Sequence, residues 1–207
     1  MDIYDAIATR KTIRDFDGRP VDRPTLTKII EAGMKAPCGG MLRTWHFIVV
    51  EDMQTRLEAL SEIGERSTED AARIVNSSGI SDANQRDLYV AVIPKQRRML
   101  VNAGALVVPC FRQPKPLLKP ASLGDLDALA SMWCCIENMM LAATAEGVFG
   151  VTAVFGDLQM ARAKTVLGVP EDYEVPCFIG LGYPAPDAKR VKQPPIDLSQ
   201  RLHFNKW

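Results

Sequence analysis

Residues 10–14 place three cations and a hydroxyl in five positions: Arg10, Lys11, Thr12 and Arg14 surround a single isoleucine. Arginine offers a planar fork of donors that fits phosphate, and threonine adds a short donor beside it. Because neighbouring side chains cannot all point the same way, such a cluster can hold more than one part of an anion. The same pattern is also typical of a solvated surface, so the cluster alone does not prove a site.

Other motifs with chemical potential are weaker. Gly180-Leu181-Gly182 lacks the third glycine of a dinucleotide fingerprint, and Pro184 follows it where a helix should begin. The sequence contains no P-loop and no G-x-S-x-G elbow. Cys38 and His46 could form a nucleophile and base, but His46 falls inside a predicted strand, and we hold that interpretation only as a minor alternative.

Length and charge bound the class of protein. A chain of 207 residues predicts a single domain, residues 1–207, with a substantial core. The formal net charge is zero, so the basic excess expected of a nucleic-acid-binding protein is missing, and we expect no nucleic-acid partner.

The cysteine and histidine content indicates compartment and metal use. Five cysteines, an odd number, and no secretory signal predict reduced thiols and a cytoplasmic protein. With two histidines and no C-x-x-C pair, we expect no metal site. The longest apolar run, 128–145, contains Glu137 and Asn138, so we interpret it as a buried helix and expect no membrane partner.

Hydrophobic periodicity predicts the elements that must position these residues. We expect helices at 3–9, from Asp22 to just before Pro37, and at 53–63, 94–103, 122–146 and 158–167. Strands are expected at 45–50, 105–111, 148–154 and 175–181, with Pro109 indicating an edge strand or a strand end. The polar stretch 65–89 is predicted to be a mobile excursion or lid, and 113–120 an ordered loop or flap.

Two features predict contact with another surface. The long helix at 122–146 is apolar on more than one face, so one face can meet the sheet and another a partner subunit. The C-terminal extension, about 185–207, carries Leu202, Phe204 and Trp207, which are unlikely to remain in water. We therefore expect the extension to dock on its own subunit or on another.

Four stretches, in the correct order, resemble the nitroreductase family of FMN enzymes. Residues 10–16, Arg-Lys-Thr-Ile-Arg-Asp-Phe, are similar to that family's R-R-S-x-R-x-F opening. Residues 36–47, from Ala-Pro-Cys-Gly-Gly to Trp-His-Phe, are similar to A-P-S-G-x-N-x-Q-P-W-x-F. The stretches 143–156 and 182–192, the latter with its basic run, agree as well. The resemblance implies an α+β fold with a central, mostly antiparallel sheet flanked by helices, in an intertwined homodimer with two FMN sites.

The resemblance also implies a role for each matching residue. Arg10 and Thr12 would hold the phosphate of a tightly bound, non-covalent FMN, with Lys11 nearby and Lys189 or Arg190 returning from the C-terminal end. Arg14 would lie by the pyrimidine edge of the ring, where a cation stabilises the charge that develops on reduction. The remaining cofactor-binding residues would be the loop Pro37, Cys38, Gly39, Gly40 and Met41, which packs across the ring from the other subunit, and the turn Val154, Phe155 and Gly156 near N5.

Three positions depart from the family pattern. Cys38 stands where serine is usual, Met41 where asparagine is usual, and Arg43-Thr44 where Gln-Pro is usual. In the family these positions help to bind the polar edge of the flavin or its ribityl chain. The departures therefore bear on substrate preference more than on whether FMN binds, because the phosphate and stacking contacts remain.

The function that follows is an FMN-dependent oxidoreductase with NAD(P)H as co-substrate. A hydride would pass through the flavin to a small electron-poor acceptor of the nitroaromatic, quinone or flavin type, and no catalytic side chain need be named because FMN carries the chemistry. A second hypothesis is a flavin-handling or redox-sensing protein without nicotinamide turnover, in which Cys38 responds to oxidant. A third is a dimeric module whose basic clusters bind another phosphate without flavin.

Overall fold

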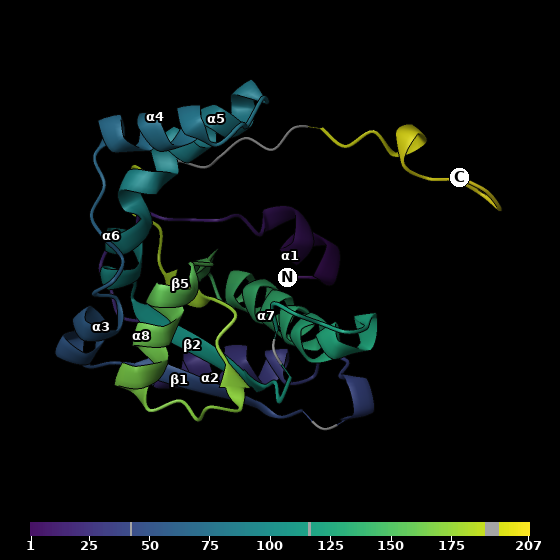
Figure 1. The fold of residues 1–207 in the computed structure, drawn as a ribbon, viewed down its shortest axis with the longest axis horizontal. Coiled ribbons are helices and arrows are strands. Elements are labelled where there is room, and N and C mark those ends of the chain that lie inside the picture. Colours follow the sequence, from purple (N-terminus) through teal and green to yellow (C-terminus); the bar gives the residue numbers. More distant parts are fainter. Residues whose placement is uncertain (42, 116, 189–194) are drawn as a thin grey trace.

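A five-stranded antiparallel sheet forms the centre of the computed structural model, which describes residues 1–41, 43–115, 117–188 and 195–207. The strand order is β1 (Trp45–Val50), β2 (Ala105–Arg112), β5 (Phe178–Gly182) and β3 (Phe149–Ala153), and β4 (Tyr173–Glu174) pairs with β2. Every pairing between these strands is antiparallel. Helices cover both faces of the sheet (Figure 1), which confirms the predicted α+β architecture.

Strand β2 is central, whereas Pro109 had predicted an edge strand or a strand end. The register explains how a proline is accommodated there. The Arg112 N–H points towards β1, where it donates to the Thr44 carbonyl, and the Gln113 N–H points the other way, to the Asp172 carbonyl. Because backbone N–H groups alternate along a strand, the nitrogen of Pro109 points to the same side as that of Gln113, away from β1. On that side Pro109 lies between the residues of β2 that pair with β5 and those that pair with β4. No strand among the described residues needs its missing donor.

Alternate residues of the sheet enter two cores. On one face Val107, Phe111 and Ile179 pack with α2 (Arg23–Gly33) and α7 (Asp127–Ala145). On the other face Val108 and Phe178 pack with residues of α6 (Gln96–Val101), α8 (Asp157–Leu167) and the segment after α3 (Met53–Ala59). The period-2 alternation of the strands thus makes a three-layer arrangement.

The helix boundaries largely follow the capping signals. The Asp2 side chain caps α1 (Ile3–Thr9), the Asp22 side chain caps α2, and Gly168 ends α8 in the left-handed conformation, with φ of 65°. Helix α3 ends earlier than predicted, at Ala59. The predicted helix 122–146 consists of a 3-10 turn, η3 (Leu123–Leu126), followed by α7.

Helix α7 is apolar on more than one side, as predicted. Met132, Ile136 and Met139 are buried in the core, whereas Cys134 on another side is exposed. By length and composition alone, Leu123–Ala145 is also long and apolar enough to cross a membrane, and 44% of the apolar window is buried inside the protein.

The stretch 65–89, predicted to be a mobile excursion or lid outside the core, contains helices that the sequence reasoning did not predict. This stretch forms two helices, α4 (Thr68–Ser77) and α5 (Ala83–Val92), that stand apart from the sheet (Figure 1). A capping box joins Ser67 and Asp70 at the start of α4, and the Asp82 side chain caps α5. The hairpin has only a small core of its own, in which Ala71 and Val75 of α4 lie four positions apart on one buried face. The short η2 (Ile93–Lys95) then leads into α6.

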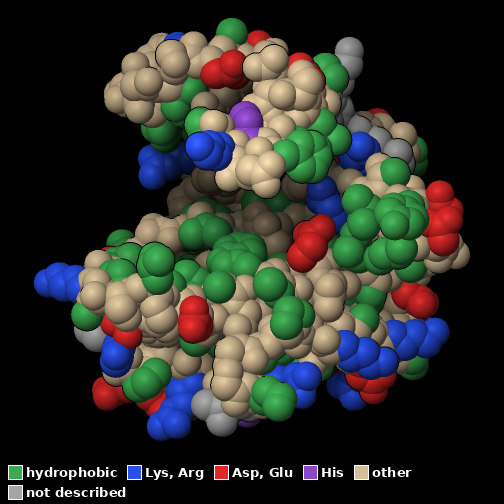
Figure 2. All heavy atoms as spheres, turned by 90° about the vertical axis from the view of Figure 1, so that its right-hand side faces the viewer, with side chains coloured by type: hydrophobic (Ala, Val, Ile, Leu, Met, Phe, Trp, Pro, Cys, Tyr) green, Lys and Arg blue, Asp and Glu red, His purple; other side chains and the backbone are tan. Residues whose placement is uncertain are grey.

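The C-terminal tail, residues 195–207, leaves the body of the molecule (Figure 1) and contains only the short turn η4 (Leu198–Gln200). Phe204 is 81% exposed and Trp207 is fully exposed. The tail therefore does not dock on its own chain. Figure 2 shows the face beneath the tail, where hydrophobic side chains gather around a hollow.

Cysteine reactivity provides a first test of this fold. Burial raises the pKa of the Cys110 thiol to about 11, and those of Cys135 and Cys177 to about 12. We expect these three thiols to resist iodoacetamide in the native protein at neutral pH, because the thiolate is the reactive form. Cys134, by contrast, is exposed and should react.

Mass spectrometry of native and urea-unfolded samples measures this difference. Full labelling of the three buried thiols before unfolding would contradict the fold. The folded state should also become less stable above pH 9, the ordinary pKa of a thiol, since the unfolded chain then loses thiol protons that the native chain keeps up to about pH 11 to 12.

Candidate functional site

The basic cluster is fixed against the edge of the sheet. Thr12 forms a parallel bridge with Gly150 of the edge strand β3, and the Ile13 N–H donates to the Gly150 carbonyl at 3.2 Å. The Ile13 side chain is fully buried, so it anchors the segment while its polar neighbours remain accessible. Further on, Phe16 bridges Pro184, just after β5. The N-terminal cluster therefore lies beside the segment that leads to the C-terminal basic run.

A cavity of about 600 Å³ opens beside Arg14. The N-terminal segment, the hairpin helix α5, the start of α6 and the segment after β5 surround it. Its lining residues are Arg14, Asp15, Phe16, Leu88, Ala91, Val92, Lys95, Arg98, Asn102, Ala185 and Asp187. The size is within the usual range for a small-molecule site.

Arg14 is the most informative residue of this cavity. Its Nε atom is buried and has no hydrogen-bond partner among the described residues. Burial lowers the pKa of Arg14, and the neighbouring Asp15 carboxylate raises it by a smaller amount. A buried N–H donor without a partner costs stability, so its presence beside a cavity points to an acceptor that is supplied from outside the described residues.

Asp15 does not neutralise Arg14 by a direct contact. The Asp15 carboxylate is instead paired with Lys95, at 2.5 Å between Oδ2 and Nζ. The Ala185 N–H donates to the Asp15 carbonyl, which ties the segment after β5 to the same place. Lys189 and Arg190, the predicted phosphate ligands from the tail, lie outside the described residues.

The other predicted phosphate ligands lie along the same segment. Arg10 Nε is 3.3 Å from the Glu137 carboxylate on α7, and the Arg10 N–H closes α1 by donating to the Ala6 carbonyl. Lys11 and Thr12 are half-buried. The structure thus brings Arg10, Thr12 and Arg14 together on one segment at the β3 edge.

The loop at 37–41 packs against a different part of α7. The Gly39 N–H donates to Ser131 Oγ at 3.1 Å, and the Cys38 sulfur accepts a hydrogen bond from the Arg43 N–H. Met41 is 77% exposed and has a φ of 56°, in the left-handed region. Cys38 has no bond to His46, which instead lies 3.3 Å from the Tyr173 hydroxyl.

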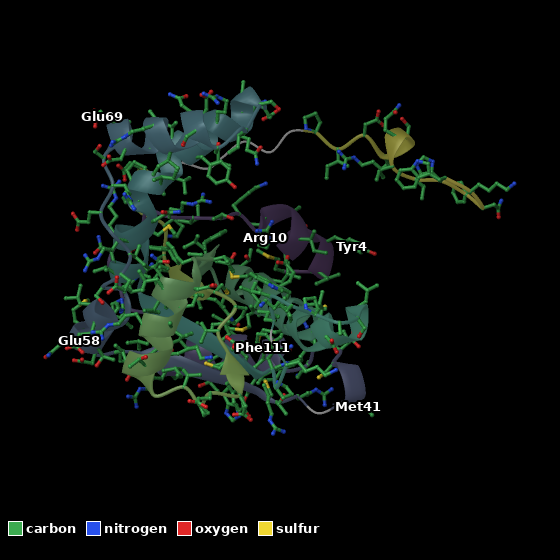
Figure 3. All side chains as sticks on the ribbon, in the orientation of Figure 1. Tyr4, Arg10, Met41, Glu58, Glu69 and Phe111 are labelled. Atoms are coloured by element: carbon green, nitrogen blue, oxygen red, sulfur yellow. The ribbon has the colours of Figure 1, made fainter. Side chains whose placement is uncertain are left out.

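A single chain does not bring this loop to the basic cluster. Ser131, which holds Gly39, and Glu137, which holds Arg10, lie six positions apart on α7. That spacing is about 9 Å along the helix axis and about 120° around it. Figure 3 shows Arg10 and Met41 in well-separated parts of the molecule.

The turn at 154–156 borders a second cavity, of about 520 Å³. Val154 and Phe155 line it together with Trp133 and Leu129 of α7 and with Leu117 and Leu118 of the proline-rich loop. Val154 is 62% exposed at the end of β3. The walls are largely apolar and include two aromatic side chains, which suits a flat apolar ligand.

Sequence reasoning missed the cavity residues on α6 and before it. Lys95, Arg98 and Asn102 lie three or four positions apart, so they share one helical face. These residues lie within the predicted helix 94–103, and their spacing on one helical face could have identified them as candidate site residues. Within the described ranges, no group of three or more His, Cys, Asp or Glu side chains is placed to hold a metal ion.

The residues of the first cavity fit a flavin nucleotide. Arg14 supplies a buried donor with no partner among the described residues, Lys95 adds positive charge, and Asn102 adds an amide. A flavin offers carbonyl oxygens, a ring nitrogen that becomes negative on reduction, and a phosphate. The donor set and the acceptors are complementary in kind.

Comparison with known proteins identifies the class. The model of the nitroreductase family matches residues 7–183, and the chain belongs to this family. A protein of Archaeoglobus fulgidus, provisionally named an NADH dehydrogenase/NAD(P)H nitroreductase, is 29% identical over 203 residues, which cover 97% of this chain and 96% of that protein.

Two solved structures share the fold. An iodotyrosine deiodinase bound to FMN and 3-iodo-L-tyrosine superposes with a TM-score of 0.77 at 18% identity, covering all of both chains. A variant of the FMN- and NADPH-dependent nitroreductase NfnB of Sphigopyxis sp. strain HMH gives a TM-score of 0.74 at 20% identity, again over all of both chains.

Proposed function

We propose that the protein is an FMN-dependent oxidoreductase that oxidises NAD(P)H and reduces a small electron-poor acceptor. The observation that carries the proposal is the buried Nε donor of Arg14, which has no partner among the described residues, beside a cavity of about 600 Å³ in a chain of the nitroreductase family. The names of two relatives support it, since one is FMN- and NADPH-dependent and the other was solved with FMN bound.

Each part of the site has a proposed task. Arg14 would bind the carbonyl edge of the flavin ring, while Arg10, Lys11 and Thr12, with Lys189 or Arg190, would bind the phosphate. The turn Val154-Phe155-Gly156 would offer backbone donors at the reactive edge of the ring. When bound, FMN supplies two-electron chemistry: NAD(P)H loses a hydride and becomes NAD(P)⁺, and a quinone acceptor, for example, gains that hydride and a proton and leaves as the hydroquinone.

The proposed assembly is a homodimer. The loop Pro37, Cys38, Gly39, Gly40 and Met41 cannot reach the Arg10 cluster of its own chain, so it would complete the site of a second copy. The exposed apolar tail and the exposed Ile3, Tyr4 and Ile7 of α1 provide apolar surface for such an interface. A cytoplasmic location is part of the proposal, because five unpaired cysteines suit a reducing compartment.

Three measurements on purified protein test the proposal. We expect an absorption spectrum of bound flavin, oxidation of NADH or NADPH that depends on an added quinone or nitroaromatic, and a dimer by analytical ultracentrifugation. Removing the tail after residue 194 should weaken the dimer. A protein that refuses FMN on reconstitution would overturn the proposal. If the protein bound FMN but oxidised neither NADH nor NADPH, the proposed oxidoreductase activity would be refuted and only flavin binding would remain.

A further inference from the structure

The first cavity has one apolar wall, provided by the hairpin helix α5. Leu88, Ala91 and Val92 follow the i, i+3, i+4 spacing of one helical face, and all three line the cavity. None of the residues of α5 is buried in the chain. The apolar face of this helix therefore points at the cavity instead of at a protein core, and an apolar ligand would cover it.

The other wall is cationic. Arg14, Lys95 and Arg98 line the cavity, and the carboxylates there are Asp15 and Asp187. Lys95 is paired with Asp15, and Asp187 is exposed. The side chain of Arg98 makes no hydrogen bond or ion pair with any described residue. Its neighbour Arg97, which does not line the cavity, is paired with Glu65 at 3.4 Å.

The cavity thus holds two guanidinium groups, those of Arg14 and Arg98, without a direct carboxylate partner among the described residues. The proposed function assigns only Arg14 to the edge of the flavin ring. Arg98 lies at the mouth of the cavity, exposed to solvent, on the element that follows the apolar wall. Because a guanidinium fork fits a carboxylate in a bidentate manner, Arg98 is suited to an anionic substituent of a second molecule.

We infer that the acceptor reduced at this site is an anionic aromatic compound, whose carboxylate Arg98 binds while its ring lies against Leu88, Ala91 and Val92. The inference rests on the proposed function and names the substrate class of the same site. Arg98 is then a specificity-determining residue: it selects acceptors by charge and takes no part in the electron transfer.

The test compares two acceptors of nearly equal shape, para-nitrobenzoate and para-nitrobenzamide, which differ in charge. We expect the FMN-loaded wild-type protein to show a kcat/KM about tenfold higher for the benzoate, the value of one hydrogen-bonded charge pair. Added salt should reduce this preference. The variant Arg98→Gln should lose it through a higher KM for the benzoate alone, and the matched control Arg97→Gln should keep it.

Two results would overturn the inference. Equal kcat/KM values for both acceptors in the wild type would remove the charge selection. Release of FMN from Arg98→Gln, followed by flavin absorbance, would assign Arg98 to the flavin instead. Calorimetric titration of both compounds separates this inference from the proposed function. Tighter binding of the benzoate without any turnover would support the anion site at Arg98 and refute the proposed oxidoreductase activity. Equal binding without turnover would overturn both.

Discussion

Replacing Arg14 by methionine should weaken FMN binding by about 10- to 100-fold, because a hydrogen bond to a charged group contributes about 1.5–3 kcal/mol. The same substitution should leave the flavin-free protein at least as stable as wild type. Burial lowers the pKa of Arg14, and no described residue accepts a hydrogen bond from its Nε atom, so the charged side chain costs folding free energy when no ligand is bound. Flavin fluorescence titration measures the first effect, and thermal denaturation of the flavin-free protein measures the second.

The pair of measurements separates a binding role from a structural one. Arg23→Met provides a control, because Arg23 is exposed and paired with Glu51 far along the sequence from the cluster. That variant should bind FMN normally. If flavin-free Arg14→Met were clearly less stable than wild type as well as weaker in FMN binding, Arg14 would serve the fold, and its role as a flavin ligand would be refuted.

The substitution Arg56→Met should destabilise the protein by about 3 kcal/mol or more, since it removes a buried charge that satisfies several acceptors. Arg56 is only 5% exposed. Its guanidinium donates to three backbone carbonyls, those of Val50, Val101 and Ala103, at 2.8–3.0 Å. These bonds join the end of β1 to the segment between α6 and β2. The methionine fills the space but leaves all three carbonyls without donors.

Urea denaturation of the flavin-free protein measures this loss. Arg66→Met, at an exposed position a few residues after α3, should change the free energy of unfolding by less than about 0.5 kcal/mol. Arg56→Lys should recover part of the stability, because an ammonium group can reach some of the carbonyls. A wild-type midpoint for Arg56→Met would mean that water satisfies the carbonyls and that Arg56 does not join these elements.

The sequence predicted the layers of the fold because local signals and burial agree there. The side chains of Asp2 and Asp22 cap helices where they were expected to, and the stripe Met132, Ile136 and Met139 is core. Prediction failed where burial is slight. The hairpin α4–α5 is polar overall, and this composition hid the cap at Ser67 with Asp70 and the four-residue spacing of the buried Ala71 and Val75.

The candidate site was predictable only in part. The cluster at Arg10, Thr12 and Arg14 is contiguous in sequence, and its types indicate anion binding. The cavity also depends on Lys95 and Arg98, which are more than 80 residues away and reach it only through the pairing of the whole sheet. The separation of the loop at 37–41 from the cluster within one chain could not be derived from sequence spacing, because the two meet α7 at different positions, Ser131 and Glu137.

The small core of the α4–α5 hairpin has a dynamic consequence. Ala71, Val75 and Ile93 form a buried cluster separate from the two larger ones, with Val90 against it. A unit with so little apolar contact opens with a lower free energy than the sheet, so its amide hydrogens should exchange with deuterium first. Because α5 is also a wall of the cavity, any bound molecule that touches Leu88 and Val92 stabilises the closed hairpin. Slower exchange in residues 68–92 would then report binding by compounds that change neither colour nor activity.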